Sequence, residues 1–170
     1  MVVFFAVNVV RFGRGELAME KHVVYYESPI GWLQIIGTNE GIERIDVVER
    51  GEENNRNVPI CVCQCIEELE QYFHKKRTSF SMPLKLVGTP FQMRVWEVLQ
   101  TIPYGETVSY AHIAKQIGQP KAVRAVGNAV GSNPITIVIP CHRVVRIGGQ
   151  LGGYAWGIER KKWLLAHETR

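Results

Sequence analysis

The sequence lacks a long hydrophobic run. No apolar stretch in its 170 residues reaches the roughly 18 residues that a helix needs to cross a bilayer. The apolar residues 1–10 lack the basic flank of a secretory signal. Cysteine is sparse, with four in the chain, and without a secretory signature this indicates a reducing compartment. We therefore expect a cytoplasmic, intracellular protein with no membrane partner.

Acidic residues are scarce in the second half of the chain. Residues 75–170 contain four Asp and Glu against fourteen Lys and Arg, a net charge of +10. Residues 1–74 contain twelve Asp and Glu against six Lys and Arg, a net charge of −6. A solvated mixed surface could show this division, but a basic half joined to an acidic half favours contact between residues 75–170 and a polyanion.

The first 18 residues differ from the ordinary start that follows at Met19. Gly15-Glu16 would be encoded as GGN-GAR two codons before Met19, and this resembles a bacterial ribosome-binding site. We expect either that translation starts at Met19, with residues 1–18 wrongly assigned to the chain, or that they add one strand.

Residues 19–80 predict a small N-terminal α/β domain. Runs rich in Val, Ile and Tyr predict three strands of a short antiparallel sheet, with a hairpin turn at residues 39–41. The strands are expected at residues 23–27, 31–38 and 42–48. Pro59 can begin a helix that runs to about His74.

Three cysteines fall near the start of that helix. Alternate helical residues diverge, so only Cys61 and Cys65 share a face, while Cys63 points elsewhere. No histidine lies at a suitable spacing to complete a metal site. We therefore expect packing residues and no bound metal.

Residues 88–170 predict a helical C-terminal domain and an α+β protein overall. Thr89 can cap a helix with Pro90 at its first position, and Ser109 can cap a second that ends at Gly118. A third helix is expected from Pro120 to about Val130, and a last one over residues 158–167. Two helices joined by a short turn predict a helix-turn-helix of the winged kind.

The pentapeptide Pro140-Cys141-His142-Arg143-Val144 places a thiol beside an imidazole, directly after the apolar run 135–139. The thiolate is the nucleophilic form of cysteine, whose free pKa is about 8.5. An adjacent His142 can act as base, and Arg143 adds positive potential. These residues alone leave open a thiol hydrolase and a DNA-binding regulator with an incidental thiol.

Several motifs over residues 89–168 occur in an order and spacing that resemble the O6-alkylguanine-DNA alkyltransferases. They read PFQMRVW, IPYGETVSY, RAVG, IPCHRVV, GGYAWG and KWLLAHE. The resemblance implies a suicide methyltransferase for DNA repair. It would move the alkyl group of O6-alkylguanine, and possibly of O4-alkylthymine, irreversibly to Cys141 in one turnover. It also implies a monomer that needs no cofactor and binds double-stranded DNA in the minor groove.

The resemblance implies a role for each catalytic residue. Cys141 takes the alkyl group, and His142 helps deprotonate it through a water. Glu168 holds His142, Tyr154 donates a hydrogen bond to the guanine O6, and Asn133 braces the turn behind the site.

The resemblance also implies how DNA is held. Arg124 enters the base stack while the damaged nucleotide is flipped out, and Tyr110 presses on the adjacent phosphate. The further residues expected to contact DNA are Lys121, Ala122, Ala125 and Arg143. The residues expected to line the substrate pocket are Pro140, Val144, Val145, Ala155 and Trp156, of which Trp156 would narrow its mouth.

Overall fold

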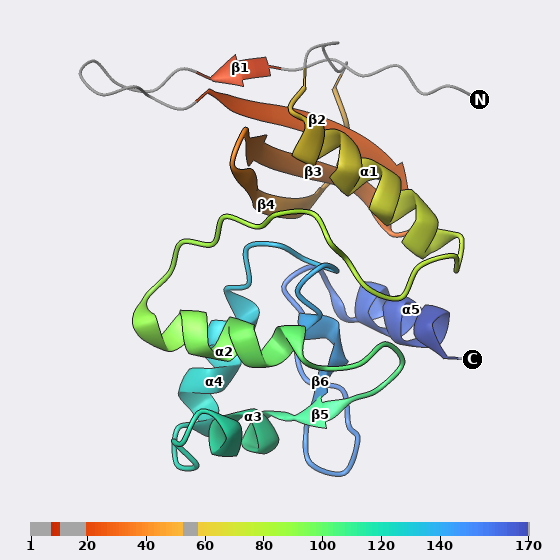
Figure 1. Cartoon of the computed structure of the whole chain (residues 1–170). Helices are drawn as coiled ribbons and strands as arrows, with labels where there is room; N and C mark the ends of the chain where they lie inside the picture. Colours follow the sequence, from red (N-terminus) through yellow and green to blue (C-terminus); the bar gives the residue numbers. More distant parts are fainter. Residues whose placement is uncertain (1–7, 11–19, 53–57, 170) are drawn as a thin grey trace. The chain divides into compact units, whose positions relative to one another are not determined.

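The computed structural model describes residues 8–10, 20–52 and 58–169, with the backbone alone described for residues 8–10. The chain divides into two compact units, residues 1–86 and 87–170, each described here by itself (Figure 1). The predicted α+β class is confirmed, because a small antiparallel sheet with one helix precedes a mainly helical unit. No helix in the described part of the chain is long and apolar enough to span a membrane.

A four-stranded antiparallel sheet forms the first unit, in the order β1-β2-β3-β4. Its strands are β1 (Asn8–Val10), β2 (Lys21–Ser28), β3 (Gly31–Thr38) and β4 (Gly41–Val48). Val24, Leu33, Ile35 and Ile45 are fully buried. β1 lies within residues 1–18, for which we expected either an added strand or a translation start at Met19. The other residues of this segment lie outside the described part of the chain.

Helix α1 (Ile60–Phe73) follows Pro59 and packs against β2, β3 and β4. Its buried stripe follows helical spacing, with Val62, Leu69 and Tyr72 fully buried. Cys61 and Cys65 are buried on this side while Cys63 is exposed, as their spacing predicted. The Cys61 thiol donates to the Thr38 carbonyl oxygen at 2.9 Å, so it serves the packing of α1 on the sheet.

Glu68 fixes the basic segment that follows α1, residues 75–85. Its carboxylate is 2% exposed and accepts hydrogen bonds from the Ser81 amide at 2.7 Å and from the Ser81 hydroxyl. Gln64 Nε2 donates to it at 2.8 Å, and the Arg77 guanidinium lies 3.3 Å away. Burial would raise the pKa of Glu68, but these hydrogen bonds and Arg77 hold it below its ordinary value.

The second unit begins with α2 (Pro90–Gln100). Thr89 Oγ1 accepts from the Gln92 amide and Gln92 Oε1 accepts from the Thr89 amide, which completes a capping box. Ser109 caps α3 (Tyr110–Gln116) by accepting from the His112 amide. Helix α4 (Val123–Gly131) begins later than the expected Pro120, because the Ala122 amide bonds to Gln119 in a turn. Helices α2 and α3 both pack against α4.

The segment between α4 and the end of the chain holds the Cys-His motif. It includes the 3₁₀ turn η1 (Cys141–Arg143), β6 (Val144–Val145) and α5 (Ile158–Glu168). β6 pairs in parallel with β5 (Val108–Ser109) and so lies beside the strand that leads into α3.

The apolar run 135–139 forms a compact buried turn. Ile135, Ile137 and Ile139 are fully buried, and Ile137 has a φ of 71°. A β-branched residue in this left-handed region is strained, so the surrounding packing must hold the turn.

Candidate functional site

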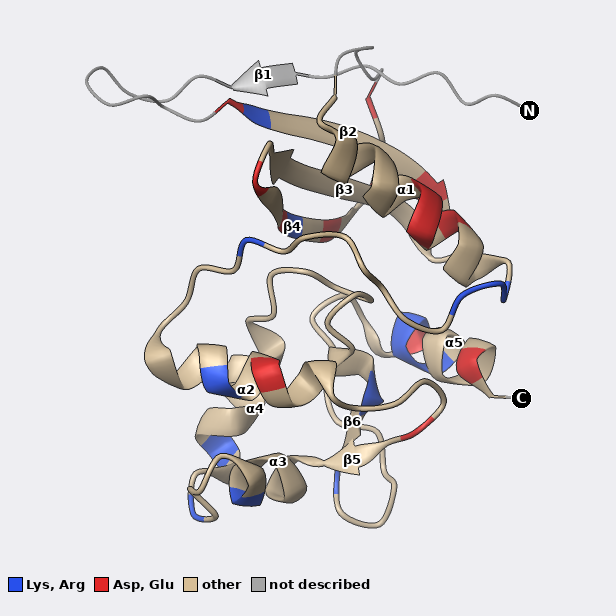
Figure 2. Cartoon of the chain, viewed as in Figure 1, with Lys and Arg blue, Asp and Glu red and all other residues tan. Residues whose placement is uncertain are grey.

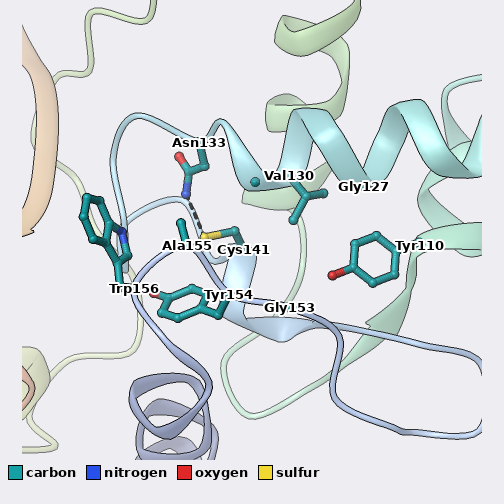
Figure 3. Close-up of a pocket in the computed structure, with 10 residues that line it drawn as sticks. Tyr110, Gly127, Val130, Asn133, Cys141, Gly153, Tyr154, Ala155 and Trp156 are labelled. Atoms are coloured by element: carbon teal, nitrogen blue, oxygen red, sulfur yellow. Dashed lines mark hydrogen bonds between the residues drawn. The ribbon is translucent and has the colours of Figure 1, made fainter.

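Cys141 lies at a cavity of about 280 Å³ in the second unit, where its side chain is 7% exposed (Figure 3). Figure 3 shows Tyr154 and Trp156 on one side of the thiol and Tyr110 on the other. Lining residues come from α3, α4 and the segment before α5. The site is therefore assembled from three parts of the sequence around one nucleophile.

Asn133 connects the thiol to the turn behind it. Its Nδ2 donates to Cys141 Sγ at 3.1 Å and to the Ile139 carbonyl at 2.8 Å, while its Oδ1 accepts from the Ile135 amide at 3.0 Å. Burial raises the pKa of Cys141, and hydrogen bonds from Asn133 and Thr136 together with the charge of Lys161 oppose this rise. Because burial dominates, the thiol needs a base.

His142 is placed to be that base. It is fully buried, and its Nε2 lies 2.8 Å from Glu168 Oε1. Burial lowers the pKa of His142, so the neutral imidazole is favoured, with its proton on Nε2 facing the carboxylate. Nδ1 then carries the lone pair, and it has no hydrogen-bond partner among the described residues.

Glu168 is 1% exposed although it is close to the end of the sequence. Besides His142, it accepts two hydrogen bonds from Arg143, at 2.8 and 2.9 Å, and one from the Gly105 amide at 3.2 Å. Burial would raise the pKa of Glu168, but His142 and Arg143 hold it well below its usual range. Glu168 is thus a fixed anion that orients the imidazole.

The predicted DNA contact by Arg143 is wrong. Arg143 is 5% exposed, and Nε and Nη2 bind Glu168 while Nη1 donates to the Ile102 carbonyl at 2.6 Å. Its guanidinium also lies 5.8 Å from the centre of the Tyr104 ring. A planar donor fork that is satisfied inside the unit cannot also reach a phosphate.

Tyr154 shares a hydrogen bond of 2.8 Å with Thr136 through their hydroxyl groups. Burial and the neighbouring Cys141 raise the pKa of Tyr154 far above its ordinary value, so its hydroxyl remains a donor. Thr136 is fully buried, and sequence reasoning missed it because it is one polar residue inside an apolar run. Lys161, also missed, is fully buried beside the site and donates to the Val144 carbonyl at 2.6 Å.

The predicted substrate pocket is only partly reproduced. Ala155 and Trp156 line the cavity. Pro140, Val144 and Val145 are buried and are not among the described residues that line it. Both side chains of β6 are buried in the core, and the strand itself pairs with β5. Lining residues that the sequence did not indicate are Gly127, Val130, Gly131 and Gly153.

Four of the predicted DNA contacts lie on α4 and on the turn that precedes it, and a fifth, Tyr110, lies on α3. Lys121, Arg124 and Ala125 are exposed and Ala122 is partly exposed. Figure 2 shows Lys and Arg on α4 and on the turn that precedes it. Tyr110 lies at the cavity, close to Gly152, where a Cβ atom would stand 2.6 Å from the Tyr110 hydroxyl oxygen. The helix-turn-helix and the thiol site therefore share one unit.

Comparisons with known proteins cover both units. The family "6-O-methylguanine DNA methyltransferase, ribonuclease-like domain" matches residues 22–86, and "6-O-methylguanine DNA methyltransferase, DNA binding domain" matches residues 90–170. A methylated-DNA–protein-cysteine methyltransferase of Mycolicibacterium paratuberculosis is 47% identical over 148 residues, which are 85% of this chain and 90% of that protein.

Two solved structures from Mycobacterium tuberculosis are similar throughout. The crystal structure of its O6-methylguanine methyltransferase has a TM-score of 0.78 at 44% identity, covering 87% of this chain and 92% of that one. The crystal structure of its OGT in complex with DNA has a TM-score of 0.77 at 45% identity, covering 85% and 90%. Sequence and structure thus agree that the chain belongs to the 6-O-methylguanine DNA methyltransferase family.

Proposed function

We propose that the protein transfers the alkyl group of O6-alkylguanine in DNA irreversibly to its own Cys141, once per molecule. Its family repairs methylated DNA by methyl transfer to a protein cysteine, and DNA is its partner. The observation that carries the finer proposal is Cys141 at a cavity, with the next residue, His142, hydrogen-bonded to the buried Glu168.

The transfer follows from the protonation states of the site. His142 Nδ1 takes the thiol proton through a bridging water, and the Glu168 carboxylate stabilises the imidazolium. The thiolate sulfur forms a bond to the methyl carbon as the bond from that carbon to guanine O6 breaks, and the electron pair stays on the guanine. The Tyr154 hydroxyl donates to O6, and the proton returns through water from His142 to the guanine.

A single turnover follows from the product. The thioether is not hydrolysed by water, and the described residues that line the cavity include no second cysteine. No cofactor takes part in this displacement, because sulfur itself supplies the electron pair.

Access to O6 requires the nucleotide to leave the duplex. The exposed Arg124 on α4 supports a role in filling the vacated space, and Tyr110 at the cavity supports contact with the neighbouring phosphate. We place α4 in the minor groove, where sequence is poorly distinguished, since damage must be found in any sequence. A monomer carries every one of these groups.

The cavity also bears on the substrate range. Trp156 is one of its walls, and a side chain that buries on the order of 200 Å² leaves less room for large alkyl groups. Methyl adducts of guanine are therefore the expected substrates, and O4-methylthymine, with a similar methylated oxygen, is a second.

Mass spectrometry after incubation with a duplex containing O6-methylguanine tests the proposal. One methyl group should appear on the Cys141 peptide, and repair should plateau at about one equivalent per protein molecule. Cys141→Ser should abolish transfer and largely spare DNA binding. Cys63→Ser, at the exposed cysteine of α1, is the matched control and should transfer normally.

Sustained turnover beyond one equivalent would contradict the proposal, as would a methyl group found on another residue. Repeated hydrolysis of an ester or amide by the same thiol would select a thiol hydrolase. DNA binding without any adduct would select a regulator.

A further inference from the structure

Lys161 is a buried positive charge that the steps above do not use. Its side chain is fully buried in the first turns of α5, and its Nζ donates to the Val144 carbonyl at 2.6 Å. Within the described part of the chain it forms no ion pair with a carboxylate. An ammonium group removed from water is strongly unfavourable unless a negative charge compensates it.

The neighbouring charges leave Cys141 as the group that can supply this compensation. Arg143 and Glu168 neutralise each other, and His142 is neutral because burial lowers its pKa. Burial keeps the hydroxyls of Tyr110 and Tyr154 protonated by raising the pKa of each. Arg146 acts on Tyr110 and Arg160 acts on Tyr154, whereas Cys141 acts on both tyrosines and on Lys161. Burial lowers the pKa of Lys161 and the neighbouring Cys141 raises it, so an ionised thiol favours the ammonium form of this lysine.

We propose that Lys161 is a positioning residue whose buried ammonium stabilises the Cys141 thiolate during alkyl transfer. This inference rests on the proposed function, because it concerns the thiolate which that reaction needs. The ammonium is held by the carbonyl of Val144, three residues after the nucleophile, so α5 brings the charge to the site through the same element that supplies Glu168.

The sequence offers a matched pair of lysines for the test. Lys162 is exposed and pairs with Glu159 at 2.7 Å on the surface of α5. Lys161→Gln removes the charge and keeps a donor for the Val144 carbonyl, and Lys161→Arg keeps a charge. Lys162→Gln removes one charge from the same helix without touching the site.

The measurement is the rate at which iodoacetamide alkylates Cys141 in the full chain, followed from pH 6 to 10 by mass spectrometry of the Cys141 peptide. The exposed Cys63 serves as an internal reference. Lys161→Gln should move the Cys141 midpoint upward by about one pH unit, a roughly tenfold slower reaction near neutral pH. Lys161→Arg should restore most of the wild-type alkylation rate, and Lys162→Gln should have the same midpoint as the wild-type protein.

Coinciding midpoints in Lys161→Gln and the wild-type protein would overturn the proposal and leave Lys161 with a packing role only. If Lys161→Gln does not fold, NMR of the Lys161 ¹³Cε signal in the wild-type chain and in Cys141→Ser decides. The signal should follow thiol ionisation in the first protein alone, and identical titrations would refute the proposal. Neither readout uses DNA, so failure of methyl transfer is distinguishable from failure of this inference.

Discussion

Gly152 sets the position of Tyr110 at the cavity. A Cβ atom at residue 152 would stand 2.6 Å from the Tyr110 hydroxyl oxygen and 3.0 Å from its ring, closer than side chains approach. A Cβ at Gly127 would meet the same ring at 3.9 Å, which is ordinary contact. The Tyr110 side chain thus occupies space that is free only because residue 152 is a glycine.

Gly152→Ala should therefore displace Tyr110 and slow duplex repair by about tenfold or more, with a lower melting temperature from overpacking. Gly153→Ala is the control for stability, because a Cβ there meets nothing within 4 Å. Single-turnover repair rates and thermal unfolding measure both effects. Addition of Tyr110→Phe to Gly152→Ala should recover part of the lost stability, and a Gly152→Ala protein as stable as Gly153→Ala would show that the ring has room to move.

The sequence shows some of the site and hides the rest for a physical reason. Cys141 and His142 are recognisable because their chemistry lies in adjacent residues. Lys161 and Thr136 are not recognisable, because their roles depend on burial beside residues that are distant in the sequence. Both are polar, so a hydrophobic pattern does not mark them as buried. Arg143 was misplaced for the same cause, since its partner Glu168 arrives from another helix.

At the scale of elements, Glu68 joins α1 to the basic segment that follows it. The hydrogen bonds from Ser81 and the charge of Arg77 act on the ionised carboxylate, and they keep its pKa below the ordinary 4.5. A group with a lowered folded pKa stabilises the protein above its unfolded pKa. This stability is lost as the pH falls through 4.5 towards the folded value.

Glu68→Gln should lower the free energy of unfolding at pH 7 by about 1–3 kcal/mol, since charge-assisted hydrogen bonds to a buried group are lost. The difference from the wild-type protein should shrink between pH 5 and pH 3, as the wild-type carboxylate takes a proton. Urea titrations across this range measure it. Glu67→Gln, on the exposed side of α1, should show no such trend. If the difference in the free energy of unfolding did not change with pH, packing rather than the charge of Glu68 would hold the segment.

Elements with local signals were predicted well. Thr89 was predicted to cap α2 because its hydroxyl can accept a hydrogen bond from the first turn of the helix. The strand at residues 31–38 was predicted because the residues of this run favour β structure. The start of α4 was wrong by three residues, because Pro120 also suits the turn that precedes the helix. The turn at Ile137 was not foreseen, since nothing local favours a left-handed isoleucine and tertiary packing imposes it.

At the scale of the molecule, the charge is divided less sharply between the structural units than between the halves of the sequence. Residues 1–86 contain ten Lys and Arg against twelve Asp and Glu, a net charge of −2, and residues 87–170 have a net charge of +6. Lys75, Lys76, Arg77 and Lys85 account for the difference because they belong to the first unit. The positive charge that remains is on the unit that carries α4.

DNA affinity should therefore fall linearly in logarithm with the logarithm of salt concentration. Arg124→Ala should slow repair of a duplex by about tenfold or more, and change reaction with free O6-methylguanine base little, because only the duplex requires a flipped nucleotide. The matched control is Arg94→Ala, an exposed arginine on α2 of the same unit. Equal losses of Arg124→Ala on both substrates would argue against its entry into the base stack.

The division of charge has a further consequence for the first encounter with DNA. A polyanion attracts residues 87–170 and weakly repels residues 1–86, so the field of the DNA draws in the second unit in preference to the first. First contacts with DNA are then expected on the second unit more often than its share of the chain alone would give. Fewer encounters then begin at residues 1–86, and the search for a rare damaged base is shortened before any hydrogen bond has formed.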